Sequence, residues 1–330
     1  RAAPNLYRLR AFRNTAEVRE RPAIAREKSR QGLLVGAGAI ALLLILLGRF
    51  VSLSPAQNVS GPLAVSASQS GQLTILAGNQ LLMHDRAGVS EEEIVAADLG
   101  FSALSPPLAH MPNGDLLLQA ISDSDPEQGE RFWQCQLATR QCNALESALA
   151  PDRVSVHPLT GELFVADLAV DKLAKMTTSG ELKASVERPL GDNPVLRLDS
   201  GLLFVNSSEG PAISVLRYED QAFGQQLDEV LLLPPAALEA EQTRVWDFAS
   251  SGTHWLVTLY NPSNGDSGLY LFDSNWSFLR QLPREGFDRP GQLVNWSNRI
   301  LLYDKQYPQL LRYSASAVSY THLRAHETRY

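Results

Sequence analysis

The chain has 330 residues and a formal net charge of −7. Residues 32–316 hold 18 Lys or Arg against 32 Asp or Glu, a balance of −14, which repels phosphate backbones and argues against a nucleic-acid partner. A segment of this length buries one large core or two modest ones.

Residues 1–31 form a basic arm that is predicted to lie in the cytoplasm. The arm holds nine Arg or Lys against three Glu. An excess of positive charge beside a membrane segment keeps that flank inside. We expect a solvated arm that sets the topology, and a docking or signalling role is the weaker alternative. The chain begins at Arg1 rather than Met, which indicates a fragment.

Residues 32–53 are predicted to form one transmembrane helix that acts as a signal anchor. Residues 32–48 carry no charge, and with "FVSL" after Arg49 the segment reaches the length that spans a bilayer. The alternative is a cleaved signal peptide with a small-x-small site at residues 54–56. The long basic flank and Arg49 favour the uncleaved anchor. We therefore expect a single-pass protein of the cytoplasmic membrane, with its N-terminus inside and the rest in the periplasm or exterior.

Residues 54–316 repeat one unit, a tight turn followed by an apolar run. The turns recur at steps of 43, 47, 40, 51 and 46 residues. The six copies are "SGQLTILA" from Ser70, "NGDLLLQA" from Asn113, "TGELFVAD" from Thr160, "DSGLLFVN" from Asp199, "SGTHWLVTLY" from Ser251 and "SNRILLYD" from Ser297.

Each copy has similar neighbours. A short segment opened by Pro or Arg precedes it, a third apolar segment follows it, and a weaker fourth is visible as "EEEIVAAD", "ELKASV" and "SFLRQL". Short alternating runs between turn residues predict antiparallel strands joined by hairpins, and no helical periodicity is sustained. Four-stranded units at this period indicate a β-propeller. The predicted fold is all-β: a six-bladed β-propeller of four-stranded antiparallel blades, preceded by the transmembrane helix.

The third copy resembles an NHL repeat. The stretch "RVSVHPLTGELFVADLAVDKLAKMTTSGEL", residues 153–182, contains the hairpin pattern P-x-T-G-x-[LI]-[YF]-V-A-D of that repeat. The match is close over this blade and weaker elsewhere, and Leu168 and Ala169 replace the usual G-N after the aspartate. The resemblance implies a propeller architecture over about residues 60–313.

Cys135 and Cys142 are the two cysteines. The turn "ATRQ" between them brings the flanking residues opposite each other in a hairpin. An exported domain is an oxidising context, so we predict a structural disulfide. A redox or metal pair is the alternative, but the spacing matches neither C-x-x-C nor a zinc set.

Asp167, Asn206 and Asp304 close the second strand of copies three, four and six. Gluconolactonase-like six-bladed propellers hold a divalent cation with such residues near the axis, so this resemblance makes them candidate ligands for a cation such as calcium. The same residue types are also good strand terminators, because their side chains accept hydrogen bonds from loop N–H groups. We favour this structural role, since the other copies offer Ala77, Gln119 and Leu259.

No catalytic or cofactor-binding residue is predicted. The acidic stretch at residues 122–130 lacks the Gly and Glu positions of a calcium loop, which indicates a solvated insertion. The native histidines lie in no nucleophile motif, and packing between blades explains the tryptophans. These residues are His84, His110, His157 and His254, and Trp133, Trp246, Trp255, Trp276 and Trp296.

Residues 317–330 are predicted to be a non-native tail. The run "AVSYTHLRAHET" resembles the translation of a transposase sequencing adaptor. This interpretation removes His322 and His326 from any catalytic site.

Two hypotheses follow for the function. The first is a non-enzymatic, membrane-tethered propeller that presents a binding scaffold to a protein or polymer and needs no cofactor. What favours it is that the sequence shows no complete catalytic constellation. The alternative is a metal-dependent hydrolase of the lactonase type, with its site at the central channel.

Overall fold

The computed structural model describes residues 63–147, 149, 151–232, 242–282, 290–296, 299–304, 309–313 and 321–324. The predicted arm and the predicted anchor lie outside these residues. Within the described part of the chain, no helix is long and apolar enough to cross a membrane.

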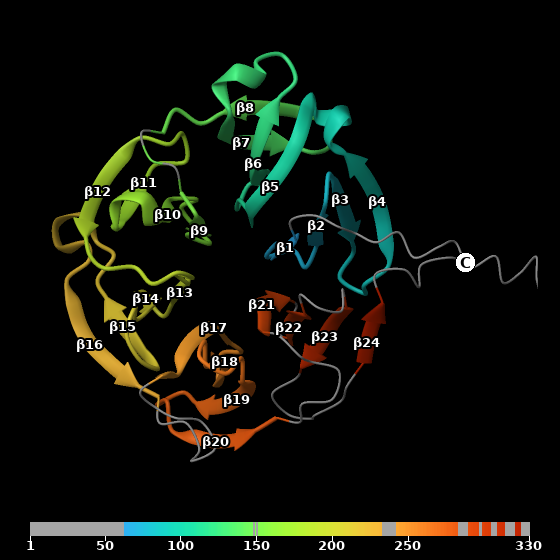
Figure 1. The fold of residues 1–330 in the computed structure, drawn as a ribbon. Coiled ribbons are helices and arrows are strands. Elements are labelled where there is room, and N and C mark those ends of the chain that lie inside the picture. The colour runs from blue at the N-terminus through green and yellow to red at the C-terminus, as the bar shows by residue number, and fades with distance from the viewer. Residues whose placement is uncertain are drawn as a thin grey trace, which may run out of the picture. The chain divides into compact units, whose positions relative to one another are not determined.

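The described strands form six four-stranded antiparallel sheets around a common axis (Figure 1). This arrangement confirms an all-β propeller with four-stranded antiparallel blades. In each blade the strands follow chain order from the axis outward.

The first three blades follow one another along the chain. Blade 1 consists of β1 (Leu63–Ala67), β2 (Leu73–Ala77), β3 (Gln80–His84) and β4 (Ser90–Val95). Blade 2 consists of β5 (Phe101–His110), β6 (Leu116–Ser122), β7 (Glu130–Gln136) and β8 (Gln141–Ala144). Blade 3 consists of β9 (Arg153–Val156), β10 (Leu163–Asp167), β11 (Lys172–Met176) and β12 (Leu182–Glu187).

The remaining blades continue the same order. Blade 4 consists of β13 (Leu196–Asp199), β14 (Leu202–Asn206), β15 (Ala212–Leu216) and β16 (Gln226–Leu231). Blade 5 consists of β17 (Arg244–Ser250), β18 (His254–Tyr260), β19 (Ser267–Asp273) and β20 (Phe278–Gln281). The sixth sheet consists of β21 (Pro290–Trp296), β22 (Arg299–Asp304), β23 (Gln309–Tyr313) and β24 (Thr321–Arg324).

Short 3₁₀ turns lie in the connections between strands. They are η1 (Ala96–Leu99), η2 (Pro126–Gln128), η3 (Leu168–Val170) and η4 (Asp220–Ala222).

Five blades, β1 to β20, take all their strands from the segment between Leu63 and Gln281. The sixth sheet takes three strands from the predicted propeller, while its outer strand β24 lies in the tail that is predicted to be non-native. The predicted count of six blades therefore includes one sheet that is completed by this tail. Residues 50–60, the predicted source of a closing strand, lie outside the described residues.

The core consists of an apolar cluster between each pair of neighbouring blades. Strand β10 shows why the blades need each other. All five of its residues are buried, and successive side chains point to opposite faces of the sheet. Leu163 and Val165 pack against blade 2, whereas Phe164 and Ala166 pack against blade 4. A blade therefore reaches a stable core only when it is covered on both sides.

Blades 1 and 6 are joined in the same way as the other neighbours. Val65 and Leu73 pack against Trp296 and Leu301. The indole Nε1 of Trp296 donates to the Gly71 carbonyl at 2.6 Å. The inner strand β21 also contacts β1, so the row of inner strands is closed.

Outer strands were the hardest to predict. Strands β4, β12 and β20 match the weak fourth segments of the sequence, and β8 matches the second strand of the predicted cysteine hairpin, but β16 was not predicted. Most side chains of β8 and β16 are exposed. A strand at the rim of the ring therefore lacks the alternating apolar pattern that identifies strands in a sequence.

The predicted disulfide is confirmed. Cys135 on β7 lies directly opposite Cys142 on β8, and the two sulfur atoms are bonded. The Cα atoms are 4.1 Å apart. The bond ties the exposed strand β8 to the buried part of blade 2.

Candidate functional site

The inner strands of all six sheets surround an axial cavity of about 650 Å³. This volume is typical of small-molecule sites. Its walls mix aliphatic side chains with hydrogen-bonding groups. The polar lining residues are Ser66, Ser68, Gln69, Arg86, His110, Ser155, Arg197, Asp199, Ser250, Ser251, Gln292 and Asn295.

The cavity extends to the end of the ring where the inner strands turn into the second strands. Gln69, Pro158 and Gly252 line the cavity in these turns, Arg86 lines it from the turn between β3 and β4, and all four residues are exposed. We call these four residues the cavity mouth. They mark an end of the cavity that is open to solvent.

A buried carboxylate, that of Asp247 on β17, lies beside this cavity. It accepts hydrogen bonds from Arg197 Nη2 at 2.8 and 3.0 Å. It also accepts from the backbone N–H groups of Phe248 and Leu293, each at 2.7 Å. Burial raises the pKa of Asp247, while the charge of Arg197 and the two N–H groups oppose that rise.

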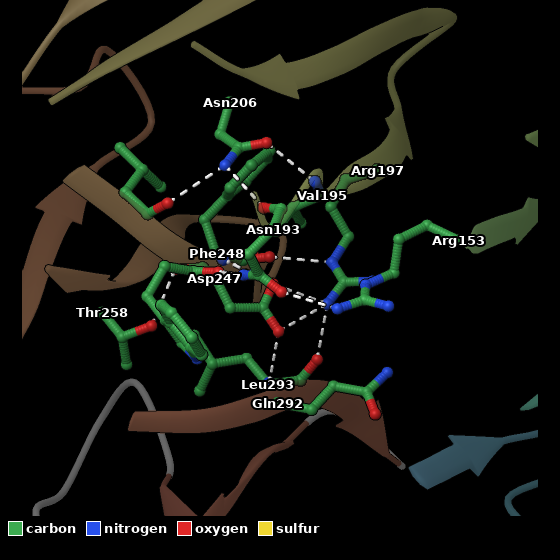
Figure 2. A network of polar contacts seen from close by, with 12 residues as sticks. Arg153, Asn193, Val195, Arg197, Asn206, Asp247, Phe248, Thr258, Gln292 and Leu293 are labelled. Atoms are coloured by element: carbon green, nitrogen blue, oxygen red, sulfur yellow. Dashed lines mark hydrogen bonds and ion pairs between the residues drawn. The ribbon is translucent and has the colours of Figure 1, made fainter. Parts of the chain in front are cut away.

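Arg197 joins three blades. From β13 in blade 4, its Nε donates to the Phe248 carbonyl at 2.8 Å and its Nη2 donates to the Leu293 carbonyl at 2.7 Å (Figure 2). Phe248 lies in blade 5 and Leu293 in the sixth sheet. The planar guanidinium suits this role, because it directs several donors at once.

Arg153 on β9 extends this network towards blade 3. Its Nη2 donates to Asn193 Oδ1 at 2.7 Å, and its Nη1 donates to the Asp152 carbonyl at 2.8 Å. The amide of Asn193 donates in turn to the Trp246 carbonyl at 2.6 Å. Burial lowers the pKa of Arg153.

Asn206, one of the candidate metal ligands, also belongs to this network. Its amide oxygen accepts from Val195 N–H at 2.7 Å. Its amide nitrogen donates to the carbonyls of Asn193 and Val245 at 2.9 and 3.0 Å. The amide oxygen and the amide nitrogen thus both have backbone partners, and the side chain fastens the end of β14 to the next blade.

The other two candidate ligands also lie at the end of the second strand of their blades, but in blade 3 and in the sixth sheet. Asp167 ends β10 and caps η3, because its side chain accepts from the Ala169 N–H. Asp304 ends β22, and its side chain lies outside the described part of the structure. The described residues contain no group of three or more His, Cys, Asp or Glu that could hold a metal ion.

The structure pairs a serine and a histidine that sequence analysis did not connect. The ring of His110 lies 3.1 Å from Ser66 Oγ through Nδ1 and 3.2 Å from Thr74 Oγ1 through Nε2. Burial lowers the pKa of His110 to about 4, which makes the ring a weak general base at neutral pH. The group therefore acts as a link between blades 1 and 2.

The sequence does not reveal this link, because Ser66 and His110 are 44 residues apart. Neither lies in a motif. The available clue was that both lie near the ends of the first strands of adjacent copies.

Asp247→Ala should lower the free energy of unfolding by about 3–5 kcal/mol. The change leaves the Arg197 guanidinium without its carboxylate and two buried N–H groups without an acceptor. Urea unfolding measures the loss. Asp199→Ala, a neighbouring carboxylate on the cavity wall, is the matched control and should cost no more than about 0.5 kcal/mol. Equal losses in the two variants would contradict the role of Asp247.

His110 should make stability depend on pH. Its folded pKa of about 4 lies below the ordinary histidine value of 6.5. Between these values the unfolded chain binds a proton that the folded chain does not, so stability is present above about pH 6.5 and falls as the pH drops to about 4. The loss from this residue is at most about 3 kcal/mol. Urea unfolding across this range should show a shallower fall for His110→Gln, and a parallel profile would refute the assignment.

Comparisons with known proteins show the fold and no family. No family model and no curated protein sequence matches the chain. A protein of unknown function from Bacteroides caccae has a TM-score of 0.51 and 14% identity, with 71% of this chain and 86% of that chain covered. The β-propeller domain of Cps50 (Swd1) from Myceliophteria thermophila has a TM-score of 0.50 and 12% identity, with coverage of 76% and 82%.

A third similar structure is the hydrazine synthase of Kuenenia stuttgartiensis, with a TM-score of 0.52 and 12% identity. The match covers 79% of each chain. At these identities the likeness extends to the propeller architecture alone.

Proposed function

We propose that this protein is a membrane-tethered, six-bladed β-propeller that binds a protein partner outside the cytoplasmic membrane. Its role is that of a scaffold rather than an enzyme. The predicted arm at residues 1–31 and the predicted anchor at residues 32–53 support the tether. The hairpin pattern of blade 3 supports a propeller of the NHL-repeat type.

One observation carries the binding role: the outer strands expose large apolar side chains. Leu182 on β12, Leu231 on β16 and Phe278 on β20 are 51%, 62% and 43% exposed. These three strands belong to consecutive blades around the ring (Figure 1). An exposed apolar edge is unfavourable in water unless a partner covers it.

The outer strands also present backbone groups at a free sheet edge. A partner segment in an extended conformation can pair with such an edge and cover its side chains. On β16, the exposed Leu231 lies on the same face as the exposed Glu229, two residues before it. The best match is therefore a segment with apolar residues and at least one Lys or Arg.

Leu231→Asp should abolish capture of the partner, because it places a charge in the apolar contact. The measurement is affinity purification of the full chain from membranes after chemical crosslinking, with circular dichroism to show that the variant is folded. Leu159→Asp is the matched control. Leu159 is 82% exposed but lies in the turn between β9 and β10, so this variant should keep the partner. No captured partner, or an equal loss in both variants, would refute the proposal.

The lactonase-type alternative remains a prediction. Elemental analysis of the purified chain, with thermal unfolding before and after a chelator, tests it. Under the scaffold proposal we expect no stoichiometric divalent ion and no change in Tm. An ion that is lost in Asp167→Ala or Asp304→Ala, together with a lower Tm, would replace the scaffold by the hydrolase.

A further inference from the structure

We infer that the cavity mouth carries a pH-sensitive latch, in which neutral His157 holds the turn between β9 and β10 against Gln69 and protonated His157 releases it. The latch regulates access to the axial cavity. It lies at the axis, whereas the proposed protein partner docks on the outer strands, so neither inference requires the other.

One hydrogen bond crosses the cavity mouth. Gln69 Nε2, in the turn between β1 and β2, donates to the Pro158 carbonyl, in the turn between β9 and β10, at 2.6 Å. These turns belong to blades 1 and 3, and blade 2 lies between them in the ring (Figure 1). Both residues line the cavity and are exposed. We call this hydrogen bond the mouth bridge, and it closes part of the open end of the cavity.

His157 holds the other side of the same peptide group. The Leu159 N–H belongs to the peptide that carries the Pro158 carbonyl, and it donates to His157 Nδ1 at 3.3 Å. The Thr160 N–H donates to the same nitrogen at 3.1 Å. Because a peptide group is planar, a rotation that moves the Leu159 N–H away from His157 also moves the Pro158 carbonyl away from Gln69. One rigid unit thus links the imidazole ring to the mouth bridge.

The mouth bridge requires an unprotonated Nδ1. A ring nitrogen of histidine accepts a hydrogen bond only in the neutral imidazole, since both nitrogens are donors in the cation. Protonation would set an Nδ1–H group against two N–H donors and remove both hydrogen bonds. Histidine is the side chain that ordinarily gains its proton between about pH 5 and 8. The latch is therefore closed at the upper end of this range and opens as the pH falls through it.

The charged groups near this turn pair with one another and not with His157. The ionisable groups on the elements around the turn and across the mouth are Tyr218, Arg86, Glu162, Asp220, Lys175 and Lys183. The last four form four ion pairs of 2.6–3.3 Å. Tyr218 packs on the His157 ring with the centroids 5.7 Å apart. Among the described residues no carboxylate forms an ion pair with His157, so its protonation is not offset by a new partner.

Only the tip of the turn needs to move. Pro158, Leu159 and Thr160 are exposed, and Leu159 is 82% exposed, so little apolar packing holds them. At the base of the turn, the His157 N–H donates to the Glu162 carbonyl at 2.8 Å, which does not involve the ring. Strands β9 and β10 therefore stay paired while the tip is released.

The test is hydrogen–deuterium exchange of the full chain in detergent at about pH 7.5 and about pH 5.5, read for residues 157–162 by mass spectrometry. After correction for intrinsic rates, exchange of the Leu159 and Thr160 N–H groups should rise about two- to tenfold at the lower pH, which is the effect of one hydrogen bond on an opening equilibrium.

A pair of nitroxide labels measures the mouth itself. Ser70→Cys and Leu159→Cys place one label on each side, and the native cysteines do not react because they are bonded to each other. The distribution of distances between the labels should be narrow at about pH 7.5 and broad at about pH 5.5. Gln69→Leu removes the donor of the mouth bridge, so it should give a broad distribution at both pH values.

His157→Asn is the decisive variant, because the Asn amide oxygen accepts from N–H groups and does not titrate. We expect slow exchange at both pH values in this variant, and fast exchange at both in His157→Leu, which has no acceptor. His254→Asn is the matched control. His254 is another half-buried histidine, with Nδ1 2.8 Å from Thr253 Oγ1 in blade 5, and this variant should keep the pH response of the unchanged chain. Circular dichroism shows that each variant is folded.

Three results would overturn the inference: exchange that does not change with pH, a pH response in His157→Asn equal to that of the unchanged chain, or a narrow distribution in Gln69→Leu. His110 cannot produce the response, because burial lowers its pKa to about 4 and keeps it neutral in the folded chain at the lower pH. Capture of the protein partner by His157→Asn should remain unchanged, so failure of the latch and failure of the scaffold proposal are distinguishable.

Discussion

Every blade of this protein is apolar on both faces, and the rest of the structure depends on covering those faces. The buried strand β10 contributes Leu163 and Val165 to one neighbour and Phe164 and Ala166 to the other. Six apolar clusters repeat this arrangement between neighbouring blades. Closure of the ring follows, since the first blade would otherwise expose the surface formed by Val65 and Leu73, which Trp296 and Leu301 cover.

A closed ring of sheets leaves a space at its axis, lined by the inner strands. The polar side chains near this space hydrogen-bond to the backbone of those strands. Backbone groups at the inner strands need partners once water is largely excluded. Arg197, Asp247 and Asn206 supply them across blade boundaries. Arg197, which fastens three blades, also lines the axial cavity. Structural support and a candidate binding site therefore share residues.

The rim and the axis of the ring have opposite properties. The rim exposes apolar side chains such as Leu231 on free sheet edges, which suits an extended protein segment. The axis encloses hydroxyl groups and charged groups of both signs. The likeness to solved propellers with 12–14% identity is a likeness of architecture, so these sites must be argued from the residues of this chain.

The sequence by itself determined the propeller class, the positions of the repeated hairpins and the disulfide, because these depend on local periodicity and short separations. The segment "TGELFVAD" forms the turn between β9 and β10 together with strand β10 itself, and Cys135 pairs with Cys142 across one turn. The outer strands β8 and β16 lacked a pattern, since exposed strands need no alternation. Only the tertiary structure joined Arg197 to Asp247 and His110 to Ser66, from different blades. It also gave Asn206 its three backbone partners. Contacts between residues about 40–50 positions apart depend on how whole blades pack against each other. The spacing of residues within one blade does not predict them.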